Sequence, residues 1–454
     1  MIGSSDEAPV MGVERSNQII QPIELINHKT WEELMQQAKS FEISKHLVME
    51  AWLRIKSNGG SAGVDKQSIS DFEKNLKDNL YRIWNRMSSG SYQPSAVKLV
   101  EIPKAGGGKR PLGIPTVTDR VCQMVAVMIL EPKLEPIFHN DSYGYRPKRS
   151  AHDALNQARS RCWKYDWVVD MDIKGFFDNI DHNLLKKALL RHTDLKWVLL
   201  YIKRWLVVPY ETEKGEKIER FKGVPQGSVI GPVLANLFLH YAFDEWMARS
   251  YPQIPFERYA DDTICHCRTE HEAEVMKEVI KERLAECDLE LNENKTSIVY
   301  CKDSNRKGNH KHIKFDFLGF TFRPRRAINK RGEYFLSFLP AISTKASKRI
   351  GETMRSWWKT SRTDKTLEEL AEKINPLLQG WINYYGKFYK TGLYHLFERL
   401  NLRLSIWVTK KFKRFRGHRT RAKQWLERVY KTTPNLFSHW KFGIKPPQSM
   451  RLTG

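Results

Sequence analysis

Three features are absent or scarce in this 454-residue chain, and each absence excludes a class of protein. No run of 18 consecutive apolar residues occurs and no apolar stretch follows Met1, so neither a membrane span nor a secretory signal is indicated. The six cysteines include no paired Cys-x-x-Cys blocks with zinc spacing, and their free thiols fit a reducing cytosol. Acidic residues are outnumbered by basic ones, 52 against 76, which indicates a polyanionic partner.

The positive charge is concentrated at one end of the chain. Of the net charge of +24, +13 lies in residues 401–454, which contain fourteen Lys or Arg and one acid, Glu427. Large aromatic residues interleave with this charge, and they are Trp407, Phe412, Phe415, Trp425, Tyr430, Phe437, Trp440 and Phe442. Cations that neutralise phosphates, together with aromatic rings that stack on bases, are typical of an RNA-binding surface. The alternatives are a solubilising surface or a disordered basic tail, and disordered tails are usually poor in large aromatics.

The most informative motif is the four-residue segment 259–262, with the sequence Tyr-Ala-Asp-Asp. Short β-prone runs, 254–258 and 263–267, flank it, so it is predicted to form a tight hairpin with two carboxylates at its tip. A hairpin tip holds a carboxylate rigidly and still exposes it, which suits a divalent metal ion that handles phosphates. Taken alone, Asp-Asp is equally well explained as a turn signal.

A second acidic strand, 168–173, favours the metal interpretation. Side chains alternate along a strand, so Trp167, Val169, Met171 and Ile173 are expected on a face that packs against helices. Asp170 and Asp172 then share the other face, where unpaired charge is costly unless a cation compensates it. Carboxylates from two strands could hold two metal ions for phosphoryl transfer, although the residues alone do not distinguish Asp170 from Asp172.

The ordered set of motifs resembles that of reverse transcriptases, and more narrowly that of the reverse transcriptase/maturases encoded by bacterial group II introns. An acidic strand is followed, five residues after Asp172, by Phe177, then by Pro225-Gln226-Gly227 and by the acidic hairpin. The supporting blocks are 102–104, 110–115, 143–147, 150–152, 291–296, 317–320 and 380–385, and the match runs from about residue 50 to about 440. The chain departs at Gly231-Pro232, where the family usually has Ser-Pro.

The resemblance implies an α+β fold, namely a right-hand polymerase with fingers and palm, followed by an α-helical thumb/maturase domain. The implied segments are a loose N-terminus at 1–28, an N-terminal extension at 29–96, fingers at 97–165, a palm with the polymerase active site at 166–324, and a helical thumb with a basic, RNA-binding maturase region at 325–454. No endonuclease domain with cysteine pairs is expected.

The resemblance also implies the site residues. Asp172, Asp261 and Asp262 are the expected catalytic carboxylates, and together with Ile173 they are expected to hold two Mg²⁺ ions. The expected nucleotide-binding residues are Lys104, Arg110, Phe177, Gln226 and Lys295. Leu318 and Gly319 form the expected primer grip. A cluster of cations in the C-terminal region is expected to bind RNA, and it consists of Lys410, Lys411, Lys413 and Arg414.

The implied partners are intron RNA, an RNA template, a DNA primer or target, and deoxynucleoside triphosphates. No membrane partner is expected, and a homodimer is compatible with the resemblance. The implied function is RNA-directed DNA synthesis, joined to intron splicing and retromobility, in the bacterial cytoplasm at the nucleoid. Two alternatives stay open. One is a reverse transcriptase of a retron, diversity-generating or defence system, and the other is an RNA-binding splicing factor with a relic polymerase site.

Periodicity predicts several further elements. Helices are expected within 31–56, 70–87, 118–134, 150–163, 181–191, 195–206, 229–247 and 270–288. In the helical region helices are expected within 343–358, 367–378 and 393–412, with Pro376 and Gly380 as breaks. Cys265 and Cys267 flank a histidine, but strand alternation places both in the sheet face, so buried thiols are expected rather than metal ligands.

Overall fold

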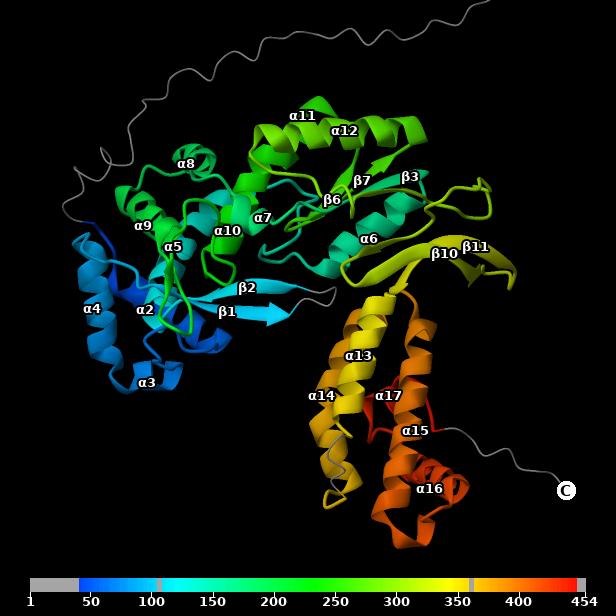
Figure 1. Cartoon of the computed structure of the whole chain (residues 1–454). Coiled ribbons are helices and arrows are strands. Elements are labelled where there is room, and N and C mark those ends of the chain that lie inside the picture. Colours follow the sequence, from blue (N-terminus) through cyan, green and yellow to red (C-terminus); the bar gives the residue numbers. More distant parts are fainter. Residues whose placement is uncertain (1–40, 104–107, 359–362, 447–454) are drawn as a thin grey trace, which may run out of the picture.

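The computed structural model describes residues 41–103, 108–358 and 363–446. It shows an upper body, in which helices pack around sheets, and a helical arm that extends from it (Figure 1). The N-terminal part and the arm lie on opposite sides of an open space beneath the body (Figure 1). The expected loose N-terminus (1–28) and the first part of the expected extension (29–40) lie outside the described residues.

The N-terminal part of the body is helical and surrounds a small sheet. Its helices are α2 (Lys45–Asn58), α3 (Ile69–Lys74), α4 (Leu76–Ser88), α5 (Val117–Leu134), α8 (His182–Leu190) and α9 (Lys196–Val207). Its sheet has the order β2-β1-β4-β5 and consists of β1 (Val97–Pro103), β2 (Lys109–Ile114), β4 (Tyr210–Glu211) and β5 (Lys217–Ile218). The expected helix over 70–87 is two helices, because the chain turns at Asn75.

The palm sheet is antiparallel and has the order β6-β7-β3-β8. Its strands are β3 (Trp167–Met171), β6 (Phe256–Tyr259), β7 (Asp262–Cys267) and β8 (Ser297–Tyr300). Elements around it are the 3₁₀ turn η1 (Glu135–Ile137), α6 (Ala151–Cys162), α7 (Phe176–Asn179), α10 (Gly231–Leu239), the π-helical turn η2 (His240–Asp244), α11 (Glu245–Ser250) and α12 (Glu270–Glu286). The single helix expected over 229–247 is therefore interrupted by a π-helical turn.

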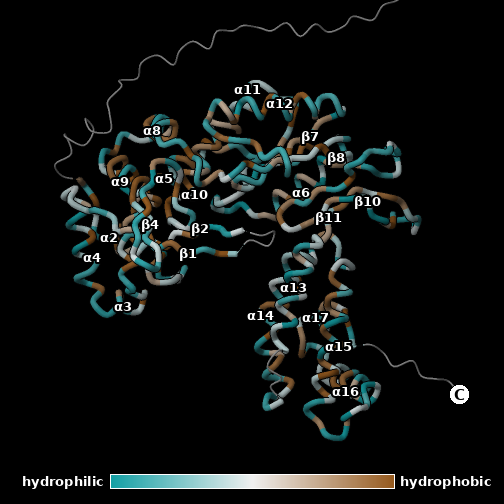
Figure 2. The backbone as a smooth tube through the Cα atoms, viewed as in Figure 1, coloured by the Kyte–Doolittle hydropathy of each residue, from teal (hydrophilic) through white to brown (hydrophobic). Residues whose placement is uncertain are grey.

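The predicted alternation of the acidic strand is confirmed. Trp167, Val169 and Met171 belong to a core that also contains the apolar side of α12, including Met276 and Ile280. On the other face Val168 is buried with Leu155 of α6, in a second core that continues into the helical arm. Cys265 and Cys267 are fully buried, as expected for structural thiols. Hydrophobic segments accordingly line the interior of both the body and the arm (Figure 2).

A long hairpin joins the palm to the arm. The hairpin consists of β10 (Phe320–Ile328) and β11 (Tyr334–Ile342). The short strand β9 (Phe315–Phe317) pairs with β10, which gives a three-stranded sheet in the order β11-β10-β9. The expected domain boundary at residues 324 and 325 therefore falls inside β10, and helical structure begins only after Ile342. The alternation of buried Phe320 and Phe322 with polar neighbours explains why this segment forms a strand.

The arm consists of helices that pack along their apolar faces. They are α13 (Thr344–Ser356), α14 (Leu367–Tyr385), η3 (Lys390–Leu393), α15 (Tyr394–Lys411), η4 (Lys413–Phe415), α16 (Arg419–Thr432) and α17 (Ser438–Lys441). The expectation that Pro376 and Gly380 end a helix is wrong, because α14 runs through both. None of the described helices combines the length and the apolarity needed to cross a membrane.

Candidate active site

The acidic turn is a tight β-hairpin whose two strands pair up to Tyr259 and Asp262. Ala260 adopts a left-handed conformation with a φ of 57°, which a residue with a Cβ rarely adopts. A neighbouring loop supports the turn, because a Cβ on Gly144 would lie 2.3 Å from the backbone nitrogen of Ala260. The backbone at position 144 therefore approaches the turn as closely as only glycine allows.

A buried network holds the carbonyl of this turn. The fully buried guanidinium of Arg258 donates to the Ala260 carbonyl at 3.0 Å, to Asn236 Oδ1 at 3.0 Å and to both oxygens of buried Asp244 at 2.7 and 2.5 Å. Asn236 in turn donates to the Gly144 carbonyl at 2.7 Å. Since Asp244 lies on the π-helical turn η2, that interruption places a carboxylate where Arg258 needs it.

Pairing of β3 with β7 brings the third carboxylate to the acidic turn. Met171 pairs with Thr263, so the next residue, Asp172, lies beside Asp262. Asp172 is held by the segment that follows α12: Asn292 Nδ2 donates to its Oδ2 at 2.9 Å, and the Lys295 ammonium lies 3.0 Å from the same oxygen. The three predicted catalytic carboxylates thus gather at one end of the palm sheet, and Lys295 contacts one of them. Asn292, which lies in the family block 291–296, was not predicted as a site residue.

Burial, together with mutual repulsion, raises the pKa values of carboxylates in this site. Burial, reinforced by Asp262, Asp316 and Asp172, raises the pKa of Asp170 to about 8. Burial and the negative charges of Asp261 and Asp172 raise the pKa of Asp262 to about 6, against the opposing effect of Lys295 and Lys345. Burial also raises the pKa of Asp261, while Arg110 lowers it. Negative charge is therefore in excess here, and additional positive charge would stabilise the site.

The chemistry of these side chains fits a hard divalent cation, because carboxylate oxygens are its preferred ligands. Within the described residues no three His, Cys, Asp or Glu side chains already form a cage for a metal ion. Ile173, the remaining predicted ligand, lies next to Asp172 and pairs with Leu291 in an isolated bridge. Its role as a ligand stays a prediction.

Two predicted nucleotide-binding residues contact one another. Arg110 on β2 donates through Nε to Gln226 Oε1 at 2.5 Å, and Gln226 Nε2 donates to Asp178 at 3.2 and 3.4 Å. The Gln226 carbonyl accepts from the Gly113 amide at 2.7 Å, which fixes the loop against the fingers strand. Asp178, which is next to Phe177, was missed because nothing in its own spacing marks it as the partner of Gln226.

The other predicted nucleotide contacts are placed differently. Phe177 is buried beside Phe176, with ring centroids 5.2 Å apart, and its carbonyl accepts from the Val224 amide at 2.7 Å. Its backbone thus fixes the loop that carries Gln226. Lys104 lies outside the described residues. Tyr145 is a half-buried neighbour of Asp261 that was not predicted as a site residue. Burial, followed by the negative charge of Asp261, raises the pKa of the Tyr145 hydroxyl.

The predicted primer grip is a tight turn that is seated on the arm. Leu318 and Gly319 both have positive φ values, 50° and 79°. The Tyr384 hydroxyl donates to the Leu318 carbonyl at 2.9 Å, and a Cβ on Gly319 would meet the Tyr385 hydroxyl at 3.2 Å. His152 stacks on Tyr384, with centroids 5.1 Å apart. Three motifs that are distant in the sequence therefore meet where the palm joins the arm.

The predicted RNA-binding cluster is only partly a free surface. Lys410, Lys413 and Arg414 are exposed, whereas the Lys411 ammonium is bound by the carbonyls of Thr363 and Lys365 at 2.9 and 2.5 Å. The expectation that the interleaved aromatics act as stacking platforms is wrong for the four that are buried in the core of the arm, namely Trp407, Phe415, Phe437 and Trp440. The helical arm uses these rings to pack its helices against one another, in the core that it shares with the palm.

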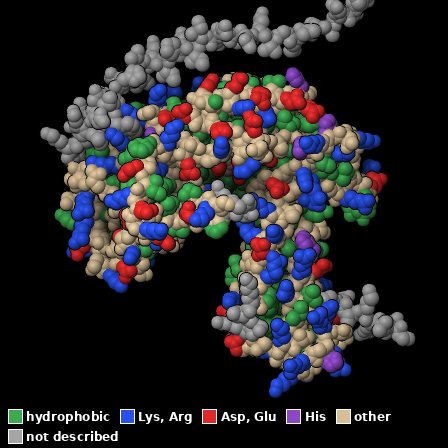
Figure 3. Space-filling model, viewed as in Figure 1, with side chains coloured by type: hydrophobic (Ala, Val, Ile, Leu, Met, Phe, Trp, Pro, Cys, Tyr) green, Lys and Arg blue, Asp and Glu red, His purple; other side chains and the backbone are tan. Residues whose placement is uncertain are grey.

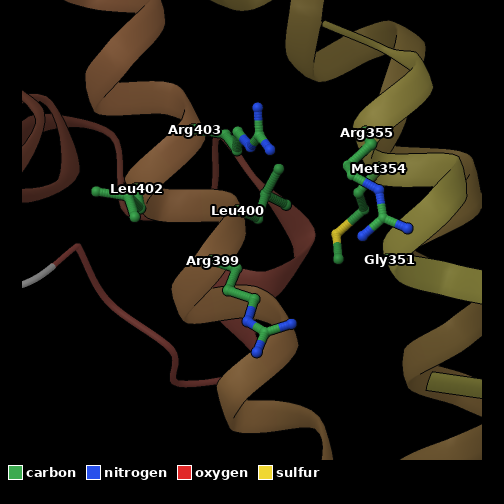
Figure 4. Close-up of a pocket in the computed structure, with 7 residues that line it drawn as sticks. All are labelled: Gly351, Met354, Arg355, Arg399, Leu400, Leu402 and Arg403. Carbon is green, nitrogen blue, oxygen red and sulfur yellow. The ribbon is translucent and has the colours of Figure 1, made fainter. Parts of the chain in front are cut away.

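Arginines also line a groove between α13 and α15. The groove has a volume of about 280 Å³, and in Figure 4 Arg399, Leu400 and Arg403 of α15 face Met354 and Arg355 of α13 across it. Arg355, Arg399 and Arg403 are exposed, and none of the seven residues lining this groove is acidic. The groove therefore adds positive charge to the face of the arm.

An antiparallel palm sheet with carboxylates at its end, next to Arg110 of β2 and the loop of Gln226, is typical of the class of nucleic-acid polymerases. Comparison with protein families makes this more specific. Residues 102–322 match the family "Reverse transcriptase (RNA-dependent DNA polymerase)", and residues 347–425 match "Group II intron, maturase-specific domain". The chain thus contains a reverse transcriptase domain followed by a group II intron maturase-specific domain.

Individual relatives agree with this family. The chain is 29% identical to Protein YkfC of Escherichia coli over 333 residues, which are 63% of this chain and 81% of that protein. It is 36% identical to Group II intron-encoded protein LtrA of Lactococcus lactis over 194 residues, which are 42% of this chain and 32% of LtrA. It is also 31% identical to an uncharacterized 91 kDa protein in the cob intron of Schizosaccharomyces pombe over 204 residues, which are 44% of this chain and 25% of that protein. The matched part of the chain thus spans most of YkfC but only about a third or less of the other two.

Among solved structures, telomerase from Candida albicans in complex with a fragment of telomeric RNA has 12% identity and a TM-score of 0.43. That alignment covers 83% of this chain and 68% of the telomerase chain, and its score is too low to support an inference.

Proposed function

We propose that this protein copies an RNA template into DNA, with two Mg²⁺ ions held by Asp172, Asp261 and Asp262. The observation that carries the proposal is the pairing of β3 with β7, which brings Asp172 to the acidic turn. When bound, such ions activate the primer hydroxyl and neutralise the departing pyrophosphate.

The protein's own residues supply binding and positioning. Arg110 and Gln226 orient the phosphates and base of the incoming nucleotide, because both lie on the fingers side of the carboxylates. Lys295 carries positive charge to the same end of the sheet and is placed to protonate the leaving pyrophosphate. Leu318 and Gly319 present backbone to the primer end, since their turn leaves the main chain unobstructed.

The helical arm carries the second half of the proposal. Its exposed cations on α15 and η4, together with the arginine groove, bind structured intron RNA and assist its splicing and its mobility. Because intron RNA and target DNA are intracellular, we place the working protein in the bacterial cytoplasm at the nucleoid. The maturase-specific match over 347–425 favours this intron function over that of a retron, diversity-generating or defence enzyme.

Isosteric replacement of the carboxylates tests the polymerase half. Asp172→Asn and Asp261→Asn should each reduce Mg²⁺-dependent primer extension on an RNA template by several orders of magnitude, because an amide is a poor ligand for Mg²⁺. RNA affinity, measured by filter binding, should stay close to that of the parent protein. Asp194→Asn, at an exposed carboxylate outside the site, is the matched control. Near-normal extension by both site variants would overturn the assignment and leave the relic interpretation.

A further inference from the structure

A second basic surface lies at the end of the palm and extends beyond the polymerase match. Residues 302–342 contain ten Lys or Arg and three acids, a net charge of +7. Residues 323–342 of this segment lie between the polymerase match, which ends at residue 322, and the maturase match, which begins at residue 347. Seven of the ten cations are exposed and make no ion pair with any described residue: Lys307, Lys311, Lys314, Arg323, Arg326, Lys330 and Arg331. Lys and Arg side chains gather at the end of the body where the β10–β11 hairpin projects (Figures 1 and 3).

Large apolar side chains are exposed among these cations. Tyr334 is 72% exposed, Ile328 is 59% exposed and Phe335 is 40% exposed. In the register of the hairpin Ile328 pairs with Tyr334, and Arg326 pairs with Leu336. Opposite residues of an antiparallel pair share a face, so Tyr334, Ile328 and Arg326 lie on the same side of the hairpin.

The tip that presents these side chains is an ordered turn. Asn329 Oδ1 accepts from the amides of Arg331 and Glu333 at 2.9 and 3.0 Å, and Asn329 Nδ2 donates to the Glu333 carboxylate at 2.7 Å. Ser304 bonds to the backbone of Leu336, which ties the basic loop that follows β8 to the hairpin. A pre-ordered surface loses less conformational entropy when it binds a ligand.

We propose that this hairpin surface, defined as Arg326, Ile328, Lys330, Arg331 and Tyr334, binds an unpaired segment of RNA. The proposal rests on the proposed function, which supplies RNA as the partner. Cations next to exposed aromatic rings match the chemistry of a single strand, because phosphates bind the cations and an unstacked base covers a ring. A duplex keeps its bases stacked and offers the rings no face.

Equilibrium binding of a fluorescent 20-nucleotide oligo(rU) to the full-length protein tests the proposal. Tyr334→Ala should weaken binding about 5-fold or more, since stacking on one base contributes ~1–3 kcal/mol. Lys330→Gln with Arg331→Gln should reduce the slope of log affinity against log salt by roughly 1.4, or about 0.7 for each lost phosphate contact. An RNA duplex of equal length should lose less affinity in the Tyr334 variant.

The β4–β5 hairpin and the segment that follows it provide matched controls. Lys214→Gln with Lys217→Gln removes two exposed cations that lie among three glutamates, and Phe221→Ala removes an aromatic ring that is 83% exposed. These controls should change neither affinity nor salt slope. If the hairpin variants behave like them, the surface does not bind RNA and its exposed rings fit a protein partner instead. A larger loss for oligo(dT) than for oligo(rU) would overturn the choice of RNA.

Photocrosslinking locates the contact directly. Oligo(rU) that contains 4-thiouridine should crosslink to the tryptic peptide of residues 332–345, which carries Tyr334. Absence of that peptide among the crosslinks would contradict the proposal even if affinity fell. Primer extension on a short, saturating template should be unchanged in the hairpin variants, so failure of this proposal is distinguishable from failure of the polymerase assignment, which the Asp172 and Asp261 variants report.

Discussion

At the scale of single residues, Arg258 is the side chain on which the geometry of the acidic turn depends. It is fully buried, it pairs with buried Asp244, and it donates to the carbonyl of Ala260, whose φ of 57° is unusual for a residue with a side chain. A left-handed residue at this position persists only if its surroundings hold it. Arg258 therefore positions Asp261 and Asp262 without touching substrate.

Paired substitutions separate positioning from stability. Arg258→Met alone should reduce the free energy of unfolding by about 3–5 kcal/mol, because it leaves the Asp244 carboxylate buried without a partner. Adding Asp244→Leu should restore most of that stability, since a buried ion pair can be replaced by apolar side chains. The single-turnover rate of primer extension should remain low in the double variant, because the Ala260 carbonyl still lacks its donor. A double variant with the parent rate would mean that the network serves stability alone.

Phe177 combines two roles that a single substitution can distinguish. The resemblance places it under the sugar of the incoming nucleotide, and the structure buries it beside Phe176. Phe177→Ala should reduce the free energy of unfolding by about 3–5 kcal/mol, because it opens a cavity in the core. It should also admit ribonucleotides, because the ring that clashes with a 2′-hydroxyl is gone. Ribonucleotide incorporation, measured together with the melting temperature, distinguishes the two roles. Loss of stability with unchanged selectivity would mean that Phe177 is only a core residue.

At the scale of elements, α14 shows how burial overrides a local helix-breaking signal. A proline inside a helix costs about 3 kcal/mol. The face that α14 buries, however, contains Ala371, Ile374, Leu378, Ile382 and Tyr385 at helical spacing, and each large apolar side chain contributes about 1.5–3 kcal/mol. Several such side chains outweigh one proline. The helix consequently continues to the tyrosines that support the turn of Leu318 and Gly319.

The short helix α17 carries a histidine that makes the stability of the arm depend on pH. His439 is fully buried among Phe397, Phe437 and Trp440, and burial lowers its pKa to about 3. Its Nε2 lies 2.8 Å from Asn401 Oδ1. In the folded arm His439 is therefore neutral, whereas in the unfolded chain it is protonated below its ordinary pKa of about 6.5.

Stability should accordingly fall on acidification. Because the unfolded state binds the extra proton, the contribution of His439 is fully present above pH 6.5 and is lost as the pH falls toward 3, by about 1.4 kcal/mol per pH unit. Urea unfolding of the parent protein at pH 7.5 and 5.5 should show this loss. His439→Gln, which keeps a donor for Asn401, should reduce the difference between the two pH values; an unchanged difference would assign it to other groups.

At the scale of the whole molecule, the two proposed activities should separate. Lys410→Gln, Lys413→Gln and Arg414→Gln together remove exposed cations, and Lys411 is left in place because its ammonium binds the carbonyls that precede α14. The triple variant should lower intron RNA affinity and reduce the salt slope by roughly 0.7–0.9 for each lost phosphate contact. DNA synthesis on a short, saturating template should change far less. Parent affinity with the parent slope would mean that these cations only solvate the arm.

The sequence by itself determined the local features of this protein. Alternation along 167–173 and the turn signal at 259–262 each depend on a few neighbouring residues, and the structure confirms the strand and the turn. The order of motifs, together with the excess of basic residues, also identified the family, because each motif is readable in its own segment.

Only the tertiary structure decided which distant residues meet. Asp172 with Asn292, Gln226 with Asp178, and Leu318 with Tyr384 are pairs up to 120 residues apart, and their contacts depend on strand pairing and helix packing rather than on local spacing. The same holds for the aromatics of the C-terminal region. Their interleaving with cations is compatible with an RNA surface or with a core, and burial of Phe437 and Trp440 assigns them to the core, because a separate helical arm needs apolar side chains to hold its helices together.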